Sequence, residues 1–246
     1  MTVPPEQARR SGQSNTVGLM QVPRGAYPAD RAAALSGVPL STVHYWSRRG
    51  ILQPSISAER VKLWSYPDLM ALRIIYWLRQ TKTAPNGAEV PRTAVPAVKR
   101  ALGQLAELDL RLWSEDSGPA VRVDRAGNVV VSSAPDAEGP HRQRALAAGE
   151  QDLLSVLDSF EAKEGTRGPD LRSPRPRLRI VPGKLGGSPH VAHTRLESQA
   201  VGALAESGLP TAKIYRLYPE VDVAAIDDAL DLERQLARNL RPLVAA

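Results

Sequence analysis

The sequence predicts a mainly α-helical protein with small β elements: an N-terminal winged helix-turn-helix, a middle β-hairpin and helix, and a C-terminal three-helix unit resembling a helix-turn-helix. Helical periodicity dominates most of the chain, and the alternating pattern of strands replaces it near Val121. One turn sequence also occurs twice, as SGVPLSTVHYW from Ser36 and as SGLPTAKIYRL from Ser207.

Composition limits the classes of protein to consider. The 246 residues suffice for two modest domains. The formal net charge of +6 and the excess of arginine favour a polyanionic partner. The absence of cysteine excludes disulfides, thiolate zinc sites and thiol nucleophiles. With no apolar run typical of a signal peptide or a membrane span, we expect a soluble, cytoplasmic protein.

Changes of pattern divide the chain into five expected parts. Residues 1–23 are polar and lack periodicity, which is typical of a disordered tail. Residues 24–116 are helical and contain the first copy of the turn. Residues 117–164 form a connector of a β-hairpin and a helix. Residues 165–176 contain three prolines and predict an Arg/Pro-rich linker, and residues 177–246 form a helical domain.

The connector combines two periods. Valines alternate with polar residues on both sides of the turn sequence RAGN at 125–128, which predicts a β-hairpin. The following segment, 142–165, predicts one amphipathic helix. Its apolar stripe consists of Leu146, Leu153, Leu157 and Phe160.

The first copy of the turn has the three residues that a helix-turn-helix requires. Ala33 provides a small side chain where the two helices cross, and Gly37 permits a positive φ in the turn. Val43, six residues after the glycine, provides the buried apolar side chain of the second helix.

From Tyr27 to Gln80 the sequence resembles the winged helix-turn-helix of the MerR family. The matching segments are LSGVPLSTVHYW, RRGIL followed by a proline, and WSYPDL. His44 stands where the family commonly has arginine, and the absence of cysteine excludes the family's thiolate metal sensing. The resemblance implies binding of duplex DNA, with the second helix in the major groove and the wing on the backbone.

The exposed face of the second helix and the wing supply the candidate DNA contacts. We expect base-edge contacts from Ser41, Thr42 and His44, and phosphate contacts from Tyr45, Arg48, Arg49, Arg60 and Lys62. The alternative is that these residues form a solvated helix surface. Trp46 and Trp64 are expected to pack in the core rather than to touch DNA.

The second copy of the turn departs from the first. Gly208 and Ile214 repeat the spacing, and Asp222 is a candidate N-cap of the following helix, but Leu204 replaces the small residue at the crossing. Acidic residues follow this copy and would repel phosphate. We therefore expect this copy to serve folding and pairing, and the first copy to read DNA.

The C-terminal segment resembles the antitoxin-like proteins of domain of unknown function family 433. The matching positions are Gly187–Pro189, Thr194–Arg195, Gly208, Tyr218–Pro219 and Ala229–Leu230, while His193 stands where the family has glycine. The resemblance implies a VapB-type antitoxin of a toxin–antitoxin pair. Its partner would be a VapC-type toxin, a metal-dependent ribonuclease of the PIN fold.

Arginines in and after the expected linker are the candidate toxin contacts. A PIN active site is a cluster of carboxylates around Mg²⁺, and guanidinium groups can compete for that negative charge. The candidates are Arg172, Arg175, Arg177, Arg179 and Arg195. A solvated linker and a nonspecific DNA clamp are the alternatives.

These observations predict a homodimeric antitoxin that neutralises a PIN-domain ribonuclease and represses its own operon at a double-stranded operator. The alternative is a ligand-responsive MerR-like regulator whose C-terminal domain serves only dimerisation. The spacing of nucleophiles, bases and carboxylates does not suggest an enzyme, and we expect no cofactor. His190 and His193 do not predict a metal site, because no carboxylate or cysteine nearby in the sequence completes a ligand set.

Overall fold

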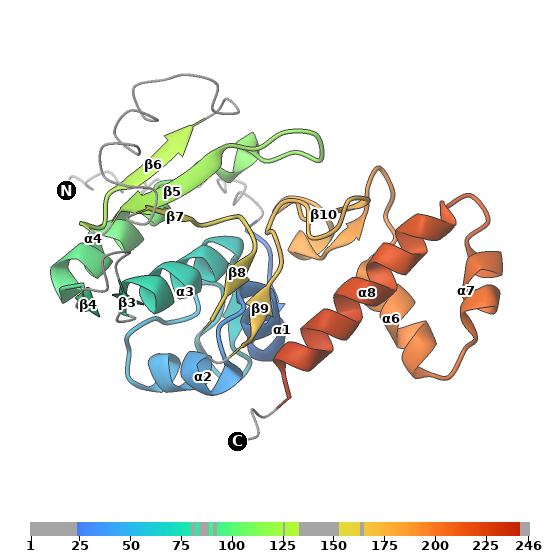
Figure 1. Cartoon of the computed structure of the whole chain (residues 1–246), viewed down its shortest axis with the longest axis horizontal. Coiled ribbons are helices and arrows are strands. Elements are labelled where there is room, and N and C mark those ends of the chain that lie inside the picture. The colour runs from blue at the N-terminus through green and yellow to red at the C-terminus, as the bar shows by residue number, and fades with distance from the viewer. Residues whose placement is uncertain are drawn as a thin grey trace, which may run out of the picture.

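The computed structural model describes residues 24–79, 82–83, 89–90, 93–124, 126–132, 153–162 and 165–241, so the tail expected at 1–23 lies outside the described residues. The protein is mainly α-helical with small β elements, which confirms the predicted fold class (Figure 1). In the described parts of the chain, no helix is long and apolar enough to cross a lipid bilayer. The longer helices are α1 (Ala29–Ser36), α2 (Leu40–Arg48), α3 (Tyr66–Arg79), α4 (Val95–Ala106), α6 (Ser198–Glu206), α7 (Thr211–Leu217) and α8 (Val223–Asn239).

Helices α1 and α2 form a helix-turn-helix with the predicted turn. Gly37 follows α1 with a φ of 74°, and its N–H donates a hydrogen bond of 2.9 Å to the carbonyl oxygen of Ala33. Ala33 and Val43 are both buried, as expected for residues at the helix crossing. The left-handed conformation at Gly37 is one that residues with a side chain rarely adopt, which explains the glycine.

A wing follows α2 and returns to the start of the domain. Strand β1 (Tyr27–Pro28) pairs antiparallel with strand β2 (Leu63–Trp64), and an isolated bridge joins Ser57 to Leu63 within the wing. Trp46 and Trp64 are 8% and 0% exposed. Their expected role in the core is therefore confirmed.

The central helix, α3, is buried along most of its length, and Arg73 on this helix is 0% exposed. Its guanidinium donates hydrogen bonds to main-chain carbonyl oxygens of three separate segments. The acceptors are Leu35, Ser36, Val156, Leu157, Asp158 and Pro169. Burial lowers the pKa of Arg73 to about 10, so the side chain remains charged near neutral pH. Arg73 thus joins the end of α1 to the middle of the chain.

Strand β5 (Ala120–Asp124) is the middle strand of a three-stranded antiparallel sheet and lies between β6 (Val129–Ser132) and β7 (Leu153–Ser155). The hairpin of β5 and β6 confirms the predicted hairpin. Before the sheet, β3 (Lys82–Thr83) pairs with β4 (Glu89–Val90), and a short 3₁₀ helix, η1, spans Leu110–Leu112.

The helix expected at 142–165 is wrong where the structure describes that segment. Strand β7 (Leu153–Ser155) pairs with β5, with Leu154 opposite Val123, and Phe160–Glu161 form strand β8. The free edge of β5 accepts the backbone of Leu153–Ser155, and this pairing overrides the helical period of the side chains. Leu157 and Phe160 are still buried, but they reach the core from extended chain. Leu146 lies outside the described residues.

The segment 165–176, expected to be a linker, makes close tertiary contacts. Strand β9 (Arg167–Gly168) pairs with β8, and the hydroxyl of Thr166 donates a hydrogen bond of 2.6 Å to the carbonyl oxygen of Gly37. A Cβ atom added to Gly37 would lie 2.2 Å from the main-chain nitrogen of Gly168. This backbone-to-backbone approach fixes the segment against the helix-turn-helix turn.

The C-terminal unit begins with a small sheet and ends with three helices. Strand β10 (Leu178–Arg179) pairs with β11 (His190–Val191), and a 3₁₀ turn, η3 (Leu185–Gly187), lies between them. The second copy of the turn has the expected local features. Gly208 has a φ of 86°, Ile214 is fully buried, and the carboxylate of Asp222 accepts the N–H of Ala224 at 3.0 Å as an N-cap.

Helix α8 runs diagonally from the C-terminal unit to α1, beside which it ends (Figure 1). The side-chain amide of Asn239 donates to the carbonyl oxygen of Ala34 at 2.9 Å. At the other side of the domain, the hydroxyl of Tyr27 donates to the carbonyl oxygen of Gly187 at 2.7 Å. The C-terminal unit therefore packs directly against the helix-turn-helix.

Candidate nucleic-acid interface

The outer face of α2 carries polar and basic side chains. Val43, Trp46 and Ser47 point into the protein, which leaves the rest of the helix open to solvent. The predicted contact residues lie on this outer face: Ser41, His44, Tyr45, Arg48 and Arg49 are exposed, and Thr42 is half-buried. This exposed face and a buried opposite face are what insertion of a helix into the major groove requires.

The basic side chains at the end of α2 are available to an anion. In the described part of the chain, no carboxylate forms an ion pair with Arg48, Arg49 or Arg60. The guanidinium of Arg49 lies 5.8 Å from the ring centroid of Tyr45, over its face. This stacking orders two of the predicted phosphate contacts relative to each other.

Lys62 in the wing holds the wing against α2. Its ammonium group donates a hydrogen bond of 2.6 Å to the hydroxyl of Ser47, and the side-chain amide of Gln53 donates to the carbonyl oxygen of Ser47 at 2.8 Å. Lys62 is half-buried as a result. An ammonium group has three donors, so two remain for a phosphate at this predicted contact. Arg60, at the outer part of the wing, is exposed.

The base of the wing is organised by the buried carboxylate of Asp68 at the start of α3. One oxygen of this carboxylate accepts hydrogen bonds from the N–H of Ser55 at 2.9 Å, from its hydroxyl at 2.8 Å, and from the N–H of Ser65 at 2.7 Å. Sequence reasoning did not single out Asp68. Its position in the segment WSYPDL was the available signal.

The arginines expected to bind a toxin are mostly engaged within the chain. Arg172 pairs with Asp158 and Asp170, Arg175 with Asp231, and Arg177 with Asp222 and Asp228. Arg179 donates to three main-chain carbonyl oxygens, including that of Glu115 at 2.9 Å. Arg195 is exposed, and its side chain has no ion-pair or hydrogen-bond partner among the described residues. The pairs of Arg175 and Arg177 hold the segment against α8, so that the four engaged arginines do not present a free basic strip.

The two histidines of the HVAH sequence bind a carboxylate. Glu115 lies between Lys184, His190 and His193, and it accepts hydrogen bonds from the ammonium group of Lys184 and from the main-chain N–H of His193. The Nε2 atom of His190 is 3.3 Å from the same carboxylate. His193 has a φ of 59°, so its backbone adopts the left-handed conformation at a position where the resembling family has glycine.

The pKa of Glu115 reflects this arrangement. Burial by itself would raise the pKa, but the hydrogen bonds from Lys184, His193 and His190 outweigh burial and lower it to about 2. The carboxylate is therefore ionised at neutral pH and joins the loop after η1 to the C-terminal unit. Among the described residues, no group of three or more His, Asp or Glu side chains is arranged to hold a metal ion.

Sequence reasoning also missed a row of arginines at the end of α8. Arg234 and Arg238 lie on this helix and Arg241 follows its last residue by two positions; all three are exposed and line the same groove. Their spacing of four and three residues was the signal that could have found them, since residues so spaced share a helix face.

Comparison with known proteins gives one match. Residues 179–231 match the family described as Protein of unknown function (DUF433). This match covers β11, α6, α7 and the first half of α8, and it agrees with the family resemblance of the C-terminal segment. Comparison with curated proteins and with solved structures found no match for the chain.

Proposed function

We propose that this protein is a duplex-DNA-binding regulator that reads its operator with α2, in the manner of the MerR family. The observation that carries the proposal is the exposed face of α2 with unpaired arginines at its end and a basic wing beside it. Tight packing below α2 holds the helix in one orientation, and base readout requires such a fixed orientation. Electrostatic attraction between these cations and phosphate would supply much of the affinity.

The second part of the proposal is that the protein is an antitoxin that neutralises a PIN-domain ribonuclease and represses its own operon. It rests on the similarity of residues 179–231 to the DUF433 family. Of the five arginines considered for this contact, Arg195 is exposed and has no ion-pair partner among the described residues. The other four would have to break their ion pairs or hydrogen bonds within the chain to bind the toxin. A homodimer is expected, because paired operator half-sites match a two-fold symmetric protein.

A ligand-responsive regulator without a toxin is the second candidate, and one observation favours it. A cavity of about 570 Å³ lies between the loop after η1 and the segment following β9. Trp113, Asp116, Arg172 and Arg179 are among its lining residues, so it offers an aromatic surface and both signs of charge. An aromatic side chain beside charged groups can orient a small polar ligand.

DNA binding is tested by a gel-shift titration with the DNA upstream of the gene at several salt concentrations. We expect Arg48→Ala with Arg49→Ala to weaken binding strongly and to lower the salt slope by roughly one for each phosphate that the variant no longer neutralises. The matched control is Lys213→Ala with Arg216→Ala, two basic residues on α7, which we expect to change the affinity by less than about tenfold. Equal losses in both variants would contradict the assignment of DNA reading to the first turn copy.

The two candidate roles of the C-terminal unit are separated by co-expression with the adjacent genes, followed by pull-down. An antitoxin is expected to co-purify with a small acidic protein and to rescue growth from its toxicity. A ligand-responsive regulator would show neither effect, and its DNA affinity would instead change with a small molecule. Light scattering of the free protein and of the DNA complex measures the expected dimer.

A further inference from the structure

The last turns of α8, together with Arg241 just after the helix, form a basic face that is separate from the exposed face of α2 and from the wing. Arg234, Arg238 and Arg241 follow one another at spacings of four and three residues, and all three are exposed. They line one side of a groove of about 550 Å³ between α6 and α8. Within the described ranges, none of the three forms an ion pair or a side-chain hydrogen bond.

The acidic groups near this face leave it positively charged. Glu233 lines the same groove, but its carboxylate is neutralised by Arg31 and also accepts the hydroxyl of Ser198. Asp231, one turn before Arg234, is paired with Arg175. Glu206 is the remaining carboxylate of the groove, so the three arginines exceed it by two charges.

The contacts of α8 place this face beside the helix-turn-helix. Asn239 lies between Arg238 and Arg241 along the chain, and its side-chain amide bonds the carbonyl oxygen of Ala34 on α1. The turn begins three residues after Ala34 at Gly37, and α2 begins at Leu40. Six residues separate Ala34 from Leu40 and span at most about 22 Å, so the end of α8 lies within about that distance of the start of α2.

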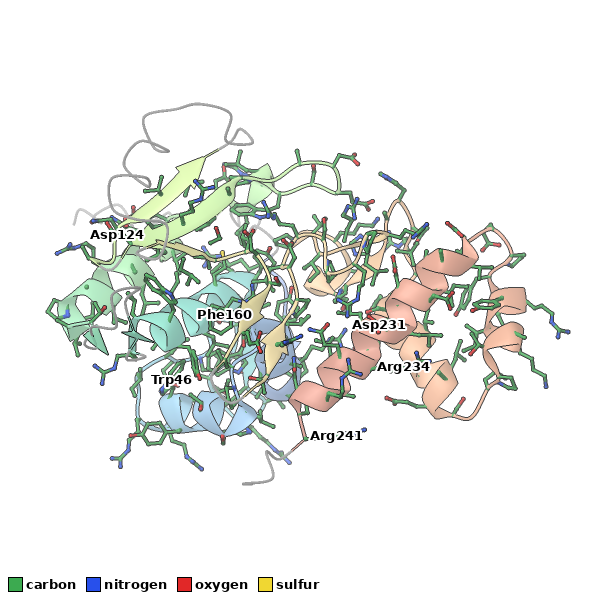
Figure 2. The ribbon with its side chains drawn as sticks, viewed as in Figure 1. Trp46, Asp124, Phe160, Asp231, Arg234 and Arg241 are labelled. Atoms are coloured by element: carbon green, nitrogen blue, oxygen red, sulfur yellow. The ribbon has the colours of Figure 1, made fainter. Side chains whose placement is uncertain are left out.

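The arrangement of the helices agrees with this placement. Figure 1 shows α2 along the lower side of the molecule, and the C-terminal end of α8 reaches the same side. In Figure 2 the side chain of Arg241 extends outward at this lower end, below that of Arg234. Helix α7, with Lys213 and Arg216, lies at the opposite end of the C-terminal unit.

We propose that Arg234, Arg238 and Arg241 bind backbone phosphates of the same duplex that α2 enters, so that the C-terminal unit forms part of the DNA interface. The inference rests on the proposed DNA binding by α2 and extends it to a second element. A bound duplex continues beyond the ends of the helix in its groove, and a row of guanidinium groups beside the start of that helix can follow the backbone.

The plain alternative is that these arginines only offset the negative end of the α8 dipole. That effect acts on the last turn of a helix and on stability. It explains Arg238 and Arg241 but not Arg234, which lies more than one turn from the end of α8. A role in the dipole would leave DNA binding unchanged, so the salt dependence of binding separates the two.

The test compares full-length wild type with Arg234→Ala, Arg238→Ala and Arg241→Ala combined. Fluorescence anisotropy with a labelled 30-base-pair duplex of arbitrary sequence, and with the DNA upstream of the gene, gives the dissociation constant at several salt concentrations. We expect the triple variant to bind both duplexes at least about tenfold more weakly at moderate salt. The salt slope should fall by about 0.9 for each phosphate that the removed arginines neutralise in wild type.

The matched control is Lys213→Ala with Arg216→Ala, which removes exposed charge from the same unit at its far end. An unchanged slope and affinity in the triple variant would overturn the inference, as would equal losses in the control. The inference would also be overturned if the triple variant no longer co-purifies with an acidic protein but still binds DNA as wild type does. That result would assign the basic face to the acidic protein. If wild type binds neither duplex, the proposed function itself fails. If wild type binds DNA and the triple variant binds it equally well, only the further inference fails.

Discussion

Arg31 on α1 and Glu233 on α8 form a bidentate ion pair across 202 residues of sequence. The two nitrogen–oxygen distances are 2.6 and 2.8 Å, and the side chains are 15% and 14% exposed. Two parallel hydrogen bonds in a largely desolvated site are stronger and more directional than an exposed ion pair. The pair therefore fixes the angle at which the C-terminal unit meets the helix-turn-helix.

The first prediction concerns this pair. Arg31→Ala and Glu233→Ala should each lower the free energy of unfolding by about 1.5–3 kcal/mol, because each leaves a charged partner without its hydrogen bonds. The double variant should lose less than the sum of the two single variants, which urea denaturation measures as a coupling energy. Arg175→Ala with Asp231→Ala is the matched control, since the carboxylate of that pair is 58% exposed. A coupling energy no larger than that of the control would contradict the prediction.

The second prediction concerns the pH dependence of stability. The pKa of Glu115 is lowered to about 2 in the folded protein, against 4.5 as its ordinary value. A depressed pKa means that the stabilising contribution is fully present above pH 4.5 and is lost as the pH falls towards 2. The difference in melting temperature between wild type and Glu115→Gln should therefore shrink over this range.

Asp116→Asn provides the control for this pH series, because the neighbouring Asp116 side chain is 80% exposed. Its effect on the melting temperature should be small throughout the range. A constant difference between wild type and Glu115→Gln from pH 6 to pH 2 would show that Glu115 is not held ionised by Lys184 and the two histidines.

The third prediction concerns truncation. The sequence alone suggests that removal of residues 165–246 would separate a toxin-binding unit from an intact DNA-binding domain. The structure predicts instead that this truncation unfolds the remainder. It removes the carbonyl oxygen of Pro169 that Arg73 binds, the carbonyl oxygen of Leu171 that the hydroxyl of Tyr66 binds, and the cover of α1 by α8. A buried donor left without a partner costs about 1–3 kcal/mol, and the truncation leaves several such donors at once.

Circular dichroism and a thermal melt check the truncation. The matched control removes residues 242–246 only, and it should melt as wild type does. A cooperative transition for residues 1–164 with helical content intact would contradict the prediction and would return the segment 165–176 to the role of a linker.

The structural features that can be predicted from the sequence are those that depend on local chemistry. The turn at Gly37, the burial of Trp46 and Trp64, and the cap at Asp222 follow from requirements of a few neighbouring residues, and the structure has each of them. The exposed face of α2 follows from the helical period in the same way. Local rules predict these features because each follows from the conformational preference or polarity of the residue and from its place in the local pattern.

The features that sequence reasoning missed depend on contacts between distant segments. The strand at Leu153–Ser155 forms because β5 has an open edge, and nothing in the helical spacing of its leucines shows that edge. Arg73 occurs in an apolar helical stretch, and its role depends on carbonyl oxygens up to 96 residues away. The arginines of the expected linker pair with acids elsewhere in the chain, Arg172 with Asp158 and Arg175 with Asp231 on α8, which turns a predicted free strip into an internal contact.

The last prediction uses the two copies of the turn as a matched pair. Gly37 and Gly208 both have a positive φ, 74° and 86°, so alanine at either position carries the cost of a left-handed residue, about 1–2 kcal/mol. Their surroundings differ. A Cβ atom at Gly37 would lie 2.2 Å from the main-chain nitrogen of Gly168, whereas a Cβ atom at Gly208 meets no atom within 4 Å. Gly208→Ala should therefore show the conformational cost alone, and Gly37→Ala should show that cost together with the displacement of β9.

We expect urea denaturation to give a loss of unfolding free energy for Gly37→Ala at least twice that for Gly208→Ala. Gly37→Ala should also weaken DNA binding, because α2 begins three residues later. Equal losses of stability in the two variants would mean that β9 does not press on the first turn in solution, and the C-terminal part of the chain would then be attached to the helix-turn-helix domain by the other contacts, such as those of α8 with α1 and of Tyr27 with Gly187.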